Sequence, residues 1–228
     1  MLDLGIVVII FIFAIIGYKR GVIKSALTLG SSVIALILSF IVYPLVEMLL
    51  KITPVYGWIY QVIDNKIKDI TFSNGLQSQA NAITESISWI PDILVEQIKA
   101  NNNKAMYDML GVTNVREYIS LYITQILIGL LAILITWLTL KIVLGIAVRL
   151  IVGIVEHVPV VSTLNRQGGG CLGIIKGVLI LSLIALVIPI FVDIPIIQNI
   201  DSAIQTNYIA KWLYENNIII IMYDYLFL

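Results

Sequence analysis

This chain contains few candidates for a catalytic or metal-binding site. His157 and Cys171 are the only histidine and the only cysteine, so a zinc site built from four Cys or His ligands and an intramolecular disulfide are both excluded. Glu156 precedes His157, but adjacent residues on a helix point apart. A hydroxyl nucleophile such as Ser162 needs a base that a third group orients. No such third group is evident, so the sequence predicts a protein that is not an enzyme.

The most unusual segment, residues 159–177, is rich in glycine. Gly169, Gly173 and Gly177 recur at every fourth position, which places them along one face of a helix. A stripe of small residues lets another membrane helix approach closely enough for backbone contact. The stripe therefore predicts a helix-packing or oligomer face.

The same segment does not fit a nucleotide-binding loop. A P-loop places G-x-x-x-x-G-K-[ST] between a strand and a helix. Lys176 is followed by Gly177 and Val178, so the hydroxyl that would bind magnesium is missing. A dinucleotide fingerprint fails for lack of a βαβ context. We expect no cofactor and no bound metal.

Five polar residues beside the apolar segments are the candidates for a functional role: Asp3, Arg20, Asn165, Arg166 and Lys176. Asp3 suits the N-cap of a first helix, with a proton-linked carboxylate as the alternative. Asn165 and Arg166 either cap the fourth helix and set its orientation, or line an inner vestibule. Arg20 is expected at the headgroups, where Lys176 would also extend its stem.

The composition shows what must position these residues. Hydrophobic residues make up 60% of the 228, charged residues make up 12%, and the mean hydropathy is +1.01. A soluble domain has about a quarter of its residues charged, so lipid must be part of this protein's solvent. The net charge is zero and no basic patch suggests nucleic-acid binding.

Four long runs are almost free of charge. They cover residues 4–18, 25–46, 118–140 and 168–192. Crossing a bilayer takes about 20 apolar residues in a helix, and the first run needs its flanking residues to reach this length. A signal peptide would carry its positive charge before the apolar run, whereas here Asp3 precedes it and Lys19 follows it. The sequence predicts an all-α, polytopic membrane protein with four transmembrane helices.

The charges also predict an orientation. Half of the 14 basic residues lie near the first and third connections between these runs: Lys19, Arg20, Lys24, Lys141, Arg149, Arg166 and Lys176. Glu156 is the one acid among them. Basic residues collect on the cytoplasmic side of membrane proteins, so we expect both termini outside the cytoplasm.

Four segments follow from this topology. They are a first transmembrane hairpin at 1–46, an extracytoplasmic helical segment at 47–117, a second hairpin with a cytoplasmic glycine-rich connection at 118–192, and an extracytoplasmic amphipathic segment at 193–228. Asn114 and Glu117 resemble a capping box that starts the third span. Ile204, Tyr208 and Trp212 lie four residues apart, which predicts an amphipathic C-terminal helix at the interface.

Several of these features together resemble the colicin V production protein (CvpA) family. They are Asp3, the turn Gly17-Tyr18-Lys19-Arg20-Gly21, the segment Leu164-Asn165-Arg166 with Gly173 and Lys176-Gly177, and the tail around Trp212. The resemblance covers about residues 1–45 and 118–215, and 47–117 is longer than expected for compact members. It implies a protein of the bacterial inner membrane that is linked to colicin V production or export and to envelope stress tolerance. It implies no established molecular activity.

Two functions from different classes are compatible with these features. We expect a non-enzymatic membrane component that forms a homo-oligomer through the glycine-rich fourth helix and contacts other membrane or envelope proteins. The alternative is a small channel or solute exporter with its pathway near that helix, because polar groups inside a membrane usually mark pathways.

Overall fold

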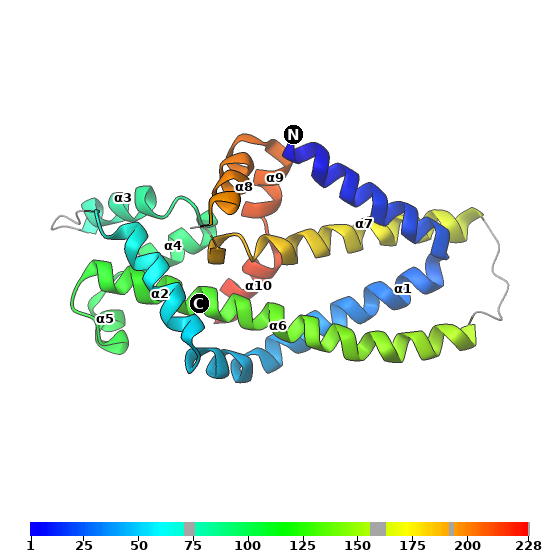
Figure 1. Cartoon of the computed structure of the whole chain (residues 1–228), viewed down its shortest axis with the longest axis horizontal. Helices are drawn as coiled ribbons and strands as arrows, with labels where there is room; N and C mark the ends of the chain where they lie inside the picture. Colours follow the sequence, from blue (N-terminus) through cyan, green and yellow to red (C-terminus); the bar gives the residue numbers. More distant parts are fainter. Residues whose placement is uncertain (71–75, 156–162, 192–193, 228) are drawn as a thin grey trace.

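In the computed structural model, which describes residues 1–70, 76–155, 163–191 and 194–227, the described chain is helical and contains no strand (Figure 1). Three helices are long and apolar enough to cross a membrane: α1 (Leu2–Lys51), α6 (Val115–Val155) and α7 (Thr163–Ala185). The prediction of an all-α chain is therefore confirmed for the described residues. α6 continues well beyond the apolar run that predicted it.

α1 consists of two arms that meet at Gly21. This residue has φ 75° and ψ 173°, which no helix accommodates, and the chain turns back on itself there (Figure 1). The arm before the bend, residues 2–20, is about 28 Å long at 1.5 Å per residue. The two arms carry the first and second apolar runs of the sequence.

α1 makes its most extensive contacts with α7 and α6. α7 runs beside the first arm (Figure 1). The second arm turns a face of small residues inward, and these are buried: Ser25, Ser31, Ser32, Ala35 and Ser39. Trp137 of α6 donates from its indole nitrogen to the Ser32 carbonyl oxygen at 3.1 Å. Small side chains on this arm thus let α6 pack close to it.

Four short helices gather at the end of the bundle away from the Gly21 bend (Figure 1). They are α2 (Pro54–Ile67), α3 (Leu76–Ser86), α4 (Asp92–Ala100) and α5 (Lys104–Leu110). Their inward faces share a core with the start of α6 that includes the fully buried Ile59, Ile63, Ile83 and Ile98. The predicted helical segment at 47–117 thus contains four helices, and its buried residues belong to the same core as the long helices.

Charged and polar side chains hold the start of α6 in place. Arg116 donates from Nε and Nη2 to the two carboxylate oxygens of Asp64 on α2, at 2.9 and 2.6 Å. The Arg116 hydrogen bond holds the pKa of the Asp64 carboxyl below its usual value. Asn114 Oδ1 accepts from the Glu117 backbone N–H at 2.9 Å, and Glu117 accepts from the Thr113 N–H at 3.1 Å. These bonds confirm the predicted cap.

The C-terminal segment differs from the single helix predicted through Ile204, Tyr208 and Trp212. It contains α8 (Pro195–Thr206), α9 (Tyr208–Glu215) and α10 (Ile218–Phe227), so that prediction was wrong. Asn207 interrupts the helix with extended backbone, φ −116° and ψ 132°. Its side-chain amide donates to the Ala203 carbonyl oxygen at 2.8 Å, which satisfies an acceptor at the end of α8.

α10 docks on the bundle rather than extending from it. Its residues Ile219, Ile220 and Tyr223 are buried. Asn217 is fully buried and donates to the Ser182 carbonyl oxygen of α7 at 2.8 Å, and it accepts from the Ile219 N–H at 3.0 Å. The amide therefore caps α10 and joins it to α7.

Candidate functional site

The first arm of α1 and the start of α7 are in backbone contact through their glycines. A Cβ atom added to Gly17 would lie 3.0 Å from the Gly173 Cα, and one added to Gly169 would lie 2.7 Å from the Gly21 carbonyl carbon. Real Cβ atoms essentially never have a neighbour closer than 3.0 Å, and a contact of 3.0 Å is already unusually tight. The pair Gly17 and Gly21 on α1 thus faces the pair Gly169 and Gly173 on α7, each with a spacing of four residues.

The predicted glycine stripe therefore faces another helix of the same chain. Gly169, Gly173 and Gly177 are all buried, and a Cβ added to Gly177 would lie 3.2 Å from Phe13 Cβ of α1. Since α1 covers this face, a homo-oligomer would need a different surface. The oligomer itself stays a prediction.

Asn165 joins the two helices at the bend. Its Oδ1 accepts from the Val22 backbone N–H at 2.8 Å, one of the N–H groups at the start of the second arm that have no partner within the helix. A Cβ added to Gly21 would lie 2.6 Å from the Asn165 Nδ2. The expectation that Asn165 caps its own helix is corrected, because α7 begins at Thr163 and this side chain caps the returning arm of α1.

Asp3 lies at the opposite end of the first arm and also caps a different helix. Its Oδ1 accepts from the Ala210 N–H in the first turn of α9 at 2.9 Å, whereas the N-cap of α1 is Met1. The Met1 ammonium donates to Asn207 Oδ1 at 3.3 Å. The predicted N-cap on Asp3's own helix is thus corrected: the carboxylate fixes the chain's start to the break between α8 and α9.

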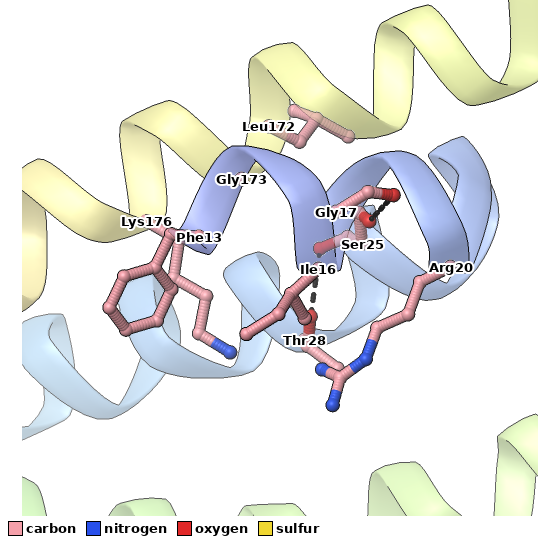
Figure 2. A pocket seen from close by; sticks show the side chains of 9 residues that line it. All are labelled: Phe13, Ile16, Gly17, Arg20, Ser25, Thr28, Leu172, Gly173 and Lys176. Carbon is pink, nitrogen blue, oxygen red and sulfur yellow. Dashed lines mark hydrogen bonds between the residues drawn. The ribbon is translucent and has the colours of Figure 1, made fainter. Parts of the chain in front are cut away.

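Beside the glycine contact lies a cavity of about 150 Å³. Both arms of α1 and the glycine-rich turns of α7 supply its lining (Figure 2): Phe13, Ile16, Gly17, Arg20, Ser25, Thr28, Leu172, Gly173 and Lys176. The glycines matter here because close approach of the backbones brings the side chains of Arg20 and Lys176 to one space. Figure 2 shows both side chains extending toward the same side of the first arm.

The electrostatic character of this cavity is cationic. Lys141 of α6 reaches its edge and donates to the Thr28 carbonyl oxygen at 3.0 Å and to Ser31 Oγ at 2.6 Å. Arg20 and Lys176 both line the cavity, and each carries a positive charge. None of the described residues that line the cavity is acidic. Three helices thus bring positive charge together, and the described lining supplies no carboxylate to balance it.

Two of the five predicted polar residues, Arg20 and Lys176, meet in this cavity. Asn165 lies at the adjoining bend, Asp3 lies at the far end of the arm, and Arg166 is exposed and not part of the described lining. Glu156, His157 and Ser162, which were considered for catalysis, lie outside the described residues.

Sequence reasoning missed the polar wall that the second arm of α1 contributes. Ser25 donates from Oγ to the Gly17 carbonyl oxygen at 3.2 Å, and Thr28 donates from Oγ1 to the Ser25 carbonyl oxygen at 3.1 Å (Figure 2). The detectable signal was the spacing of Ser25, Thr28 and Ser32 at i, i+3 and i+7 within an apolar run. Such a pattern places hydroxyls on one face of a helix.

These features define an all-helical protein with long apolar helices and a cationic cavity among them, and they indicate a membrane protein. The comparison with family models is specific: the model of the colicin V production protein family matches residues 2–77 and 106–216. The chain belongs to this family. The family model passes over residues 78–105 only, so it covers more of the long segment 47–117 than the resemblance seen in the sequence did. No curated protein matches the chain, and no solved structure does.

Proposed function

We propose that this protein is a non-enzymatic, four-span component of the bacterial cytoplasmic membrane that supports the production or export of colicin V-type toxins and the integrity of the envelope. In this proposal the two arms of α1, together with α6 and α7, cross the bilayer. Both termini and the short helices α2–α5 and α8–α10 lie outside the cytoplasm. A homo-oligomer and contacts with other envelope proteins belong to the same proposal.

One observation carries the proposal, namely the different character of the two ends of the bundle. The Gly21 bend lies at one end, and the short helices α2–α5 lie at the other (Figure 1). Lys19, Arg20, Lys24 and Arg166 lie around the bend and the start of α7. Basic residues in short connections favour the cytoplasmic side, which supports a cytoplasmic bend.

Cysteine labelling tests this orientation. In a Cys171→Ser background, which removes the exposed native thiol, one cysteine is introduced at the exposed Gln205 of α8 or at the exposed Lys19 beside the bend. On intact spheroplasts a membrane-impermeant maleimide should label the Gln205→Cys variant, and it should label the Lys19→Cys variant only after permeabilisation. The reverse pattern, or equal labelling of both variants before permeabilisation, would refute the topology.

A second candidate is a small channel or solute exporter, and the cavity beside Lys176 favours it because polar groups within a membrane often mark a pathway. Two measurements separate the candidates. A supporting component should restore colicin V release to a secreting strain that lacks its own family member, while the pure protein conducts neither phosphate nor chloride in liposomes under imposed gradients. Solute flux above that of empty liposomes would favour the exporter.

A further inference from the structure

The cationic cavity lacks a counterion within the described chain. Lys176 and Lys141 are half-buried and Arg20 is exposed, and the three side chains come from three different helices. Like charges held near one another raise the free energy of a protein, more so where burial removes water from them, and an opposite charge offsets this cost. The described residues that line the cavity include no Asp or Glu, so an anionic ligand would meet no competing carboxylate among them.

The donors that remain available define the chemistry of that ligand. The Ser25 and Thr28 hydroxyls already donate to backbone oxygens, so the wall of the second arm offers acceptors and no free donor. The guanidinium of Arg20 and the ammonium of Lys176 are the donors that face the space (Figure 2). Guanidinium forks bind phosphate oxygens in pairs, and an ammonium group adds a point charge.

The size of the cavity agrees with a compact anion. At about 30 Å³ per water molecule, 150 Å³ holds about five waters, which is room for one tetrahedral phosphate group. The rest of the lining consists of the two glycines and the apolar residues Phe13, Ile16 and Leu172, and Ile16 is exposed at the surface of the bundle. An apolar rim beside a cationic pocket suits a phosphate that carries acyl chains.

We propose that the cavity between the two arms of α1 and α7 is a binding site for a phosphate group, held by Arg20 and Lys176 with Lys141 at its edge. The phosphate belongs either to the headgroup of an anionic phospholipid or to a soluble phosphate. The proposed topology, with the Gly21 bend at the cytoplasmic side, would place a bound lipid in the cytoplasmic leaflet. The phosphate site itself does not rest on that topology. The site does not require a role in toxin export.

Native mass spectrometry of the purified full-length protein tests the proposal. The protein is titrated with phosphatidylglycerol or with phosphatidylcholine of the same acyl chains, and lipid that stays bound is counted. Wild type should retain the anionic lipid preferentially. The double variant Arg20→Gln/Lys176→Gln should bind it about tenfold more weakly, because it loses charge-assisted hydrogen bonds. Displacement of the lipid by millimolar inorganic phosphate would assign a soluble anion; resistance to displacement would assign the headgroup.

Two controls keep the test specific. Lys19→Gln removes one positive charge at the same level of the molecule, but Lys19 does not line the cavity, so this variant should retain lipid within about twofold of wild type, as expected for an exposed charge. Arg20→Lys/Lys176→Arg keeps both charges and should retain most of the binding, which separates a lost site from a misfolded protein. Equal retention of the two lipids by wild type would overturn the proposal. So would equal anionic-lipid binding by the double glutamine variant and Lys19→Gln.

Discussion

Gly173→Ala should lower the thermal unfolding midpoint of the purified protein by roughly 2–12 °C, the equivalent of about 1–3 kcal/mol of overpacking. The added methyl carbon would lie 2.9 Å from the Phe13 carbonyl carbon and 3.1 Å from the Ala14 Cα. Both neighbours are backbone atoms, so the first arm of α1 and α7 must move apart as rigid helices. Far-UV circular dichroism of the protein in detergent follows the transition.

Gly170→Ala is the matched control, because Gly170 lies three residues before Gly173 on the same helix. There the methyl carbon would lie 3.6 Å from the Ala14 carbonyl oxygen and 3.7 Å from Tyr18 Cβ, which are ordinary contacts. Alanine is the better helix former by about 1 kcal/mol, so this midpoint should equal or exceed that of wild type. Gly177→Ala should fall between the two, because its nearest neighbour, Phe13 Cβ at 3.2 Å, is a side-chain atom. Equal midpoints for all three variants would show that α1 and α7 are not in backbone contact.

Gly21→Ala should have the second large effect, because two independent costs act at the bend. With φ 75° and ψ 173° the backbone lies in a region that is essentially restricted to glycine. The new methyl carbon would also lie 2.6 Å from the Asn165 amide nitrogen, and that side chain caps Val22. We expect a loss of about 1–3 kcal/mol from the backbone alone and a further loss from the displaced cap, measured as a lower unfolding midpoint.

Gly111→Ala is the control that measures how much stability is lost through positive φ alone. Gly111 ends α5 with φ 68° and ψ 29°, a left-handed conformation that costs other residues about 1–2 kcal/mol, and a Cβ there has no atom within 4 Å. Gly21→Ala should therefore destabilise clearly more than Gly111→Ala. If the two variants lose the same stability, neither the special backbone at Gly21 nor its contact with Asn165 contributes.

The elements of this protein were predictable because they depend on local composition. Apolar runs with almost no charge form long helices wherever they occur, and Asn114 with Glu117 caps α6 through residues that are close in sequence. The break at Asn207 was not predictable from the spacing of Ile204, Tyr208 and Trp212. That spacing reports periodicity only, while the break is held by contacts of Asn207 with Ala203 and with the distant N-terminus.

The candidate site was likewise predictable only in part: its residues could be named from the sequence, but their partners could not. Residue types alone marked the glycine stripe, Arg20, Asn165 and Lys176, since small residues and charges are conspicuous in apolar helices. Their partners depend on which helices meet. Asn165 binds Val22 across 143 positions of the chain, and Asp3 binds Ala210 across 207.

By itself, then, the sequence determined an all-helical chain, its long apolar helices and the small set of polar residues beside them, because hydrophobicity and helix-forming tendency act over a few neighbouring residues. Only the tertiary structure decided that the glycine stripe faces α1 of the same chain. The same folding brings Arg20 of α1 and Lys176 of α7 to one cavity, with Lys141 of α6 at its edge. The physical reason is that a glycine face can accept any close helix, and the bend at Gly21 selects which one.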